Sequence, residues 1–210
     1  MSNKKTIYLI RHGETEFNKD GIVQGSGIDS SLNENGIKQA KLFYNSYKHV
    51  DFDHVYVSAL KRTYESIADF IDIENREYSS LCQLNEICWG DFEGNKPEAK
   101  SREVYYETIK SWKKGFYENK MNNGESPQEV QNRLKNALEI IMQNMEHENI
   151  LLCMHGRAMK IMLCTLLDIS LSKMEKFSHS NLCLYRLKME NNKWKIIDHN
   201  NTDHLRFGCL

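Results

Sequence analysis

The sequence predicts one α/β domain of three layers (α-β-α), with helices on both faces of a mostly parallel sheet. Apolar runs at residues 6–10, 54–58 and 150–154 have the length and composition of buried strands. Stripes of apolar residues at helical spacing separate these runs, and strands that alternate with helices predict parallel pairing. No repeat, linker or low-complexity tract divides residues 1–210, which we therefore expect to form a single domain.

Two helices are predicted after the first two strands. Asn33 is a preferred cap for the first of them. Their apolar residues recur every three or four positions: Ile37, Ala40, Tyr44 and Tyr47 in the first helix, and Leu60, Tyr64, Ile67 and Ile71 in the second. Each helix is therefore predicted to have one face that packs on the sheet and one polar face.

A third helix is predicted to begin at Ser126. Serine is a preferred cap, Pro127 suits the first helical turn, and Glu129 completes a capping box. Residues 91–125, before this helix, are rich in charge, asparagine and aromatics and show no clean helical stripe, so we interpret them as an insertion over the sheet. The buried face of the third helix is predicted at Val130, Leu134, Ala137, Ile141 and Met145.

The end of the chain repeats the opening pattern and then forms a predicted hairpin. The strand at residues 150–154 ends on His155 and is followed by an apolar helix from about residue 158 to 167. Two further strands are predicted at residues 182–190 and 193–199. Asn191 and Asn192 join them, and asparagine tolerates the left-handed conformation that a tight hairpin needs.

Composition limits the partners and the location that we expect. Lysine plus arginine (28) nearly cancels aspartate plus glutamate (29), so no broad field would attract nucleic acid or an anionic membrane. The apolar run before Arg11 is too short for a secretory signal, and no apolar stretch is long enough to span a membrane. We expect a cytoplasmic protein. The six cysteines lack a C-x-x-C spacing and are predicted to be reduced, most of them in the core.

Several motifs for cofactors and metals are absent. No Gly-Lys dipeptide occurs, which excludes a Walker loop, and Ser30 stands where the dinucleotide fingerprint after Gly25 and Gly27 needs glycine. No cysteine is followed by arginine six residues later, and the histidines show no zinc-binding spacing. We therefore expect no metal and no cofactor.

One motif suggests a different phosphatase chemistry. Asp51, Asp53 and Val55 match the D-x-D-x-[TV] pattern of magnesium-dependent aspartyl phosphatases. In those enzymes the aspartates follow an apolar strand, whereas here the apolar run comes after them. The pair is therefore predicted at the wrong end of the strand and is interpreted as a polar loop.

Basic and titratable side chains follow three of the predicted strands. Arg11 and His12 come directly after the first strand, and Arg62 and His155 lie at or just past the ends of two others. Ligands of open α/β sheets bind outside the carboxyl ends of the strands. Arginine can bind two phosphate oxygens at once, and a neutral histidine can act as the nucleophile. An acid such as Glu86 or Glu93 can protonate the leaving oxygen. Together, these basic, titratable and acidic residues favour phosphoryl transfer as the reaction.

These residues resemble the histidine phosphatase superfamily, the phosphoglycerate mutase-like proteins, along essentially the whole chain. Residues 11–15 with Asn18 are similar to the signature R-H-G-[ED]-[ST]-x-x-N of that family. Further matches are Gln24, Gly25, Asp29, Leu32, Gly36, Gln39 and Ala40, residues 58–63, residues 84–86 with Gly90, Glu93 with Gly94, residues 124–126, and His155 with Gly156.

The resemblance implies a role for each matched site residue. It implies that His12 is the phosphorylated nucleophile and Glu86 the general acid and then base, with Glu93 as the alternative acid. Arg11, Arg62 and His155 would hold the phosphoryl oxygens. The assisting groups would be Asn18, Gln24, Gly25 and Gly156, with Trp89 as the aromatic residue after the acid; Asn18 and Gln24 could equally be turn formers.

The substrate-binding region favours a phosphatase over a mutase. Mutases of the family carry Trp-Arg-Arg-Gly-Phe, but here Lys113 and Lys114 replace the arginines and lose the bidentate fork. The segment between Lys114 and His155 also looks shorter than in mutases and lacks their Pro-Pro. A mutase must exclude water from its intermediate, which a shorter lid does less well.

We therefore predict a phosphomonoesterase that acts on a small phosphorylated metabolite through a phosphohistidine. Mutase-type phosphoryl transfer, an isomerase activity, is the alternative; an aspartyl phosphatase using Asp51 and Asp53, and a phospho-ligand-binding protein without activity, are less favoured. Residues 91–125 would form a lid over the active site and determine selectivity. The sequence leaves open the substrate, a homodimer, the role of Lys113 and Lys114, and the role of the tail at residues 200–205, which resembles that of small-molecule phosphatases in the family.

Overall fold

The computed structural model describes residues 5–96 and 98–206 and contains one sheet of mixed direction. Its six strands lie in the order β3-β2-β4-β1-β5-β6. The first four of these run parallel, whereas β5 is antiparallel to β1 and β6 is antiparallel to β5. The strands are β1 (Thr6–Arg11), β2 (His54–Val57), β3 (Tyr78–Ser80), β4 (Asn149–Met154), β5 (Leu184–Glu190) and β6 (Lys193–Asn201).

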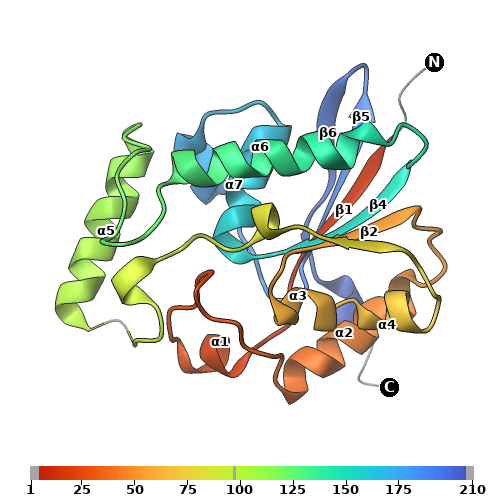
Figure 1. Cartoon of the computed structure of the whole chain (residues 1–210), viewed down its shortest axis with the longest axis horizontal. Coiled ribbons are helices and arrows are strands. Elements are labelled where there is room, and N and C mark those ends of the chain that lie inside the picture. The colour runs from red at the N-terminus through yellow and green to blue at the C-terminus, as the bar shows by residue number, and fades with distance from the viewer. Residues whose placement is uncertain (1–4, 97, 207–210) are drawn as a thin grey trace.

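Helices cover both faces of this sheet, which confirms the predicted three-layer α/β class (Figure 1). Helices α6 and α7 lie on one face, and α2, α3 and α4 lie on the other, while α5 stands at one end of the molecule. The helices are α1 (Glu16–Asp20), α2 (Glu34–Tyr47), α3 (Lys61–Glu65), α4 (Ala68–Asp72), α5 (Ala99–Lys113), α6 (Pro127–Gln143) and α7 (Gly156–Leu166). Four 3₁₀ turns, η1 to η4, occupy Cys82–Leu84, Gly90–Phe92, Leu171–Lys176 and Asp203–Leu205.

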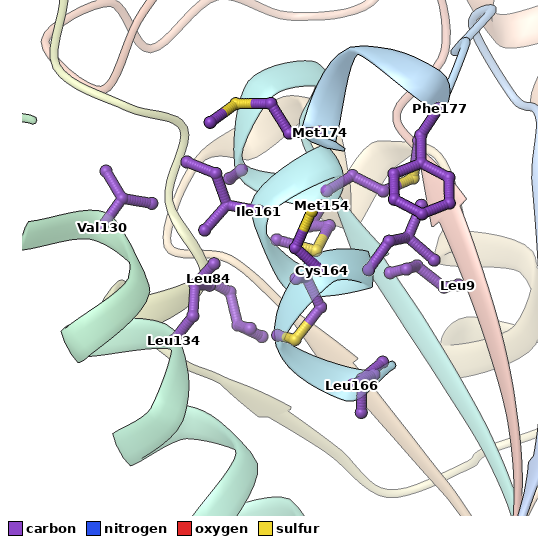
Figure 2. Close-up of a cluster of buried hydrophobic side chains, with 14 of the residues drawn as sticks. Leu9, Leu84, Val130, Leu134, Met154, Ile161, Cys164, Leu166, Met174 and Phe177 are labelled. Atoms are coloured by element: carbon purple, nitrogen blue, oxygen red, sulfur yellow. The ribbon is translucent and has the colours of Figure 1, made fainter. Parts of the chain in front are cut away.

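Two apolar cores lie on the two faces of the sheet. In β1, Leu9 belongs to the core under α6 and α7, and Ile10 belongs to the core under α2 and α4. Figure 2 shows the first core, where Leu134 of α6 faces Cys164 of α7. Because successive strand residues point to opposite faces, β1 and β4 contribute to both cores, which explains their continuous apolar sequence.

The predicted helical stripes were partly wrong. Met145 is 63% exposed because α6 ends at Gln143, before the turn that leads into β4. Ile37 is 48% exposed, since α2 turns Gly36 and Phe43 inward instead. The stripe from residue 60 to 71 is divided into α3 and α4.

Residues 91–125 also differ from the expectation, because they contain α5, a helix of 15 residues. Its Ile109 and Trp112 are buried, and the Trp112 indole donates a hydrogen bond to the carbonyl of Asn119 (2.7 Å). The segment is therefore tied into the core by a narrow apolar stripe between charged residues.

The predicted hairpin is confirmed, because Asn191 and Asn192 have φ values of 51° and 59° between β5 and β6. Five cysteines, Cys82, Cys88, Cys153, Cys164 and Cys183, are free, and the last three are buried; Cys209 lies outside the described residues. Within residues 5–96 and 98–206, no helix has the length and apolar character needed to cross a membrane.

Candidate active site

The carboxyl ends of β1 and β4 bring the two predicted site histidines together. His12 follows β1, and its amide continues the ladder by donating to the carbonyl of Met154 at the end of β4 (3.0 Å). His155 is the N-cap residue of α7 directly after β4. The two imidazole rings are both buried, and their centroids are 5.2 Å apart.

The hydrogen bond of His12 defines its tautomer. Its Nδ1 lies 2.7 Å from the carbonyl oxygen of Gly13, and a carbonyl only accepts, so Nδ1 carries the proton. Burial, assisted by the charges of Arg11 and Arg62, lowers the pKa of His12 well below its ordinary value. The ring is therefore neutral, and its Nε2 keeps a lone pair for nucleophilic attack.

Arg62 is held in one orientation by neighbouring acceptors. Its Nε donates to His155 Nδ1 (3.2 Å), Nη1 donates to the carbonyl of Ile28 (2.6 Å), and Nη2 donates to the carbonyl of Gly25 (3.2 Å). Burial lowers the pKa of Arg62 to about 10, although nearby carboxylates, first that of Glu86, offset part of the effect. The guanidinium therefore stays charged at neutral pH.

His155 supports Arg62 with one ring nitrogen and bonds Ser58 with the other. Since Nδ1 accepts from Arg62, the ring proton is on Nε2, which lies 2.8 Å from Ser58 Oγ. Burial first, and then the charge of Arg62, lowers the pKa of His155 well below its ordinary value. Both ring nitrogens are thus engaged within the protein, which favours a positioning role for this residue.

Arg11 has a partner that the sequence did not indicate. Its Nη1 donates to Nδ1 of His179 (3.2 Å), a residue of the loop before β5. Its Nε is buried and has no hydrogen-bond partner within the described part of the chain. Gly156 makes room for His179, because a Cβ at this glycine would lie 2.8 Å from the His179 ring.

Glu86 lies at the start of α7, close to the arginines. Its Oε1 accepts from the amides of Ile87 (2.9 Å) and Ala158 (2.8 Å), and its Oε2 accepts from the amide of Arg157 (2.9 Å). The side chain is buried, and it is near enough to Arg11 and Arg62 to raise the pKa of both guanidinium groups against the larger effect of burial.

Glu93, the alternative acid, is engaged elsewhere. Its carboxylate accepts from the amides of Gly27 (2.9 Å) and Trp89 (2.8 Å) and so connects two loops. This arrangement favours a structural role for Glu93 and leaves Glu86 as the candidate acid.

Gln24 borders the arginine, whereas Asn18 is mainly a capping residue. The Gln24 amide lies 3.0 Å from Arg62 Nη1, and because a guanidinium only donates, the carbonyl oxygen of the amide faces it. Asn18 completes the capping box of α1 with Thr15. Its Oδ1 also accepts from Asn181 (3.0 Å), which donates to the His12 carbonyl as well (3.1 Å).

Trp89 lies beside a buried charged cluster that the sequence did not reveal. The Arg157 guanidinium stacks over the rings of Trp89 and Trp112 at 5.8 Å and 5.6 Å. Arg157 and Lys160 of α7 both bind the carboxylate of Glu175. Burial opposes the charge of Glu175, but the two cations lower its pKa to about 2. No motif marked Arg157, because it is the second residue of a helix with a mostly apolar sequence.

The aspartates of the alternative motif lie at the other end of the sheet. Asp53 accepts from the amides of Glu148 and Asn149 at the start of β4, and Asp51 pairs with Arg76. Among the described residues, no three His, Cys, Asp or Glu side chains cluster in a way that could hold a metal ion. Lys113 and Lys114 are exposed at the end of α5.

Comparisons with known proteins agree with this geometry. A family model described as the histidine phosphatase superfamily (branch 1) matches residues 7–202. Phosphoserine phosphatase 1 of Hydrogenobacter thermophilus is 32% identical over 199 residues, which cover 95% of this chain and 93% of the relative. Adenosylcobalamin/alpha-ribazole phosphatase of Salmonella typhimurium is 26% identical over 192 residues, 91% of this chain and 89% of the relative. The crystal structure of phosphoserine phosphatase from Entamoeba histolytica in complex with 3-phosphoglyceric acid is 28% identical, with a TM-score of 0.82 over 96% of this chain and 99% of that one.

Proposed function

Because the chain belongs to the histidine phosphatase superfamily, we propose that it hydrolyses small phosphomonoesters without a metal, through a phosphohistidine on His12. The observation that carries this proposal is the state of His12. Its Nδ1 proton is held by the Gly13 carbonyl, and its lowered pKa keeps the ring neutral, so Nε2 is available as the nucleophile.

In the first step, His12 Nε2 forms a bond to phosphorus as the bond from phosphorus to the ester oxygen breaks. Glu86 gives its proton to that oxygen, and the alcohol leaves. Glu86 Oε1 already accepts two amide bonds and Oε2 accepts one, so Oε2 is the oxygen with room for this proton.

In the second step, water attacks the phosphohistidine. The Glu86 carboxylate takes a proton from that water, the bond between phosphorus and His12 Nε2 breaks, and inorganic phosphate leaves. Arg11 and Arg62 stabilise the charge on the phosphoryl oxygens, with the buried Nε of Arg11 as an available donor. We assign His155 to orienting Arg62 through Nδ1.

The remaining expectations stay predictions. These are a single domain over residues 1–210, a lid at residues 91–125, a cytoplasmic location and a homodimer. Mutase activity is the second candidate, and the exposed Lys113 and Lys114 favour hydrolysis over it because lysine lacks the fork that holds a second anionic group.

A phosphate-release assay tests the function. We expect the protein to hydrolyse p-nitrophenyl phosphate in EDTA, His12→Ala to abolish this activity, and the exposed His49→Ala to retain it. Wild type mixed with excess substrate and quenched in alkali should retain a phosphohistidine. The same treatment of His12→Ala should yield none. Activity only with magnesium would instead support Asp51, and conversion of 3-phosphoglycerate to 2-phosphoglycerate faster than its hydrolysis would establish a mutase.

A further inference from the structure

A cavity of about 380 Å³ lies between the loop of Gln24 and the aromatic residues around Trp89. Gln24 belongs to its wall, and the Gln24 amide is the group that lies 3.0 Å from Arg62 Nη1. Gln24 therefore connects the cavity to the arginine that we propose to hold the phosphoryl oxygens. The rest of its wall consists of Val23, the aromatic residues Trp89, Phe92, Tyr105 and Tyr106, and one charged residue, Arg102.

We propose that this cavity binds the leaving group of the ester and selects a planar, apolar one. This inference rests on the phosphomonoesterase activity proposed above and names its substrate class: phosphate esters of alcohols that carry an aromatic or similarly flat hydrophobic group. The volume is in the range of small-molecule sites, and aromatic walls favour flat ligands that can stack on them.

The wall is held in place by contacts behind it. The Trp89 ring stacks on Trp112, with centroids 6.1 Å apart and an interplanar angle of 26°. Arg157 covers both rings, and its Nη2 donates to the hydroxyl of Tyr105 (3.1 Å). Because these side chains are already fixed, a flat ligand would bind without the entropic cost of ordering them.

The charges around the cavity disfavour an amino acid as the leaving group. Among the described residues that line the cavity, none is acidic and Arg102 is a cation, so a ligand ammonium group would find a like charge and no carboxylate there. Behind the wall, Arg157 and Lys160 share the single carboxylate of Glu175, which leaves this cluster with a net positive charge. A neutral aromatic group avoids both the missing counterion and the repulsion.

The test compares esters whose leaving alcohols have similar intrinsic reactivity. We would measure kcat/KM for 2-naphthylmethyl phosphate, ethyl phosphate, O-phosphoserine and 3-phosphoglycerate. All four are esters of alkyl alcohols, so none gains rate from the better leaving ability of a phenol. We expect the naphthylmethyl ester to be preferred over each of the other three by about tenfold or more, a factor consistent with one or two aromatic contacts.

Two exposed aromatic residues provide a matched pair of variants. Tyr106 is 65% exposed and lines the cavity, whereas Tyr78 is 45% exposed and lies in β3, outside the residues that line the cavity. In Tyr106→Ala we expect the ratio of kcat/KM for the naphthylmethyl ester to that for ethyl phosphate to fall about threefold to tenfold. Tyr78→Ala should leave the ratio unchanged.

The outcomes separate this inference from the function on which it rests. If all four esters are hydrolysed but O-phosphoserine or 3-phosphoglycerate is preferred, or the ratio is the same in Tyr106→Ala and wild type, the leaving-group inference is wrong and the phosphatase activity stands. If no ester is hydrolysed by wild type, the proposed function itself fails.

Discussion

The titration of His179 should make the protein less stable in mild acid. This imidazole is neutral in the folded state, since its Nδ1 accepts from Arg11. Burial first, and then the charges of Arg11, Lys160 and Arg157, lowers its pKa to about 3 from an ordinary value of 6.5. Between these two values the unfolded chain binds a proton that the folded protein does not, so the free energy of unfolding falls as pH falls.

The size of the effect follows from this difference. One proton bound only by the unfolded state changes the free energy of unfolding by about 1.4 kcal/mol per pH unit. Between about pH 7 and about pH 5 the unfolded His179 goes from mostly neutral to almost fully protonated, which amounts to about 2 kcal/mol. Its partial exposure reduces the expected contribution to about 1–2 kcal/mol.

The variant His179→Asn isolates this contribution. Asparagine does not titrate and keeps an oxygen that can accept from Arg11. The pKa values of His12 and His155 are also lowered, first by burial, which the variant keeps, and His179 is only the last of the causes that lower the pKa of His12. The fall in stability from about pH 7 to about pH 5 should therefore be about 1–2 kcal/mol smaller in the variant.

Urea unfolding at several pH values, with the free energy extrapolated to water, measures this difference. The exposed His49→Asn is the control and should follow wild type. If His179→Asn lost as much stability as wild type on acidification, the folded protein would be protonating His179, and the reasoning about burial and neighbouring charge would be refuted.

Two further predictions concern the acid and the backbone around it. In Glu86→Gln, kcat should fall by roughly 10²–10⁴-fold for alkyl phosphates and less for p-nitrophenyl phosphate, whose leaving group needs little protonation; equal losses for both esters would argue against a general acid. Gly90→Ala should reduce the free energy of unfolding by more than about 2 kcal/mol, because φ is +57° and a Cβ would lie 1.9 Å from the carbonyl oxygen of Asn122. Gly21→Ala, at φ +66° with nothing within 4 Å, should cost only about 1 kcal/mol of strain in the same urea assay, so equal losses would exclude the contact as the cause.

Local patterns predicted five of the six strands and most of the candidate site, but missed the short edge strand β3, which has no apolar run. A strand that is buried on both faces has a continuous apolar sequence, so β1 and β4 were visible directly. Because parallel strands end at one edge, His12 and His155 could be expected to meet there before any contact was known. The observed 5.2 Å between their rings follows from this topology.

The parts that were missed depend on tertiary contacts. His179 reaches Arg11 across 168 positions in the chain, from a loop without a recognised motif. Arg157 is buried on a mostly apolar helix, and its partner Glu175 lies in η3. The inward face of α2 was misjudged for a similar reason: Gly36 packs against the backbone of Glu14, which no hydrophobic period indicates.

The partners of the two arginines explain how a chain with net charge −1 can offer a strongly cationic site. Arg11 and Arg62 each donate to a neutral imidazole, that of His179 and that of His155. If a carboxylate held either guanidinium, an incoming phosphate dianion would first have to displace it, and much of the attraction would be lost. Glu86 is the nearby acid, but its oxygens accept from backbone amides, Oε1 from those of Ile87 and Ala158 and Oε2 from that of Arg157. Histidine thus fixes the direction of each arginine without neutralising it, and this charge in turn helps to keep the nucleophilic ring of His12 unprotonated.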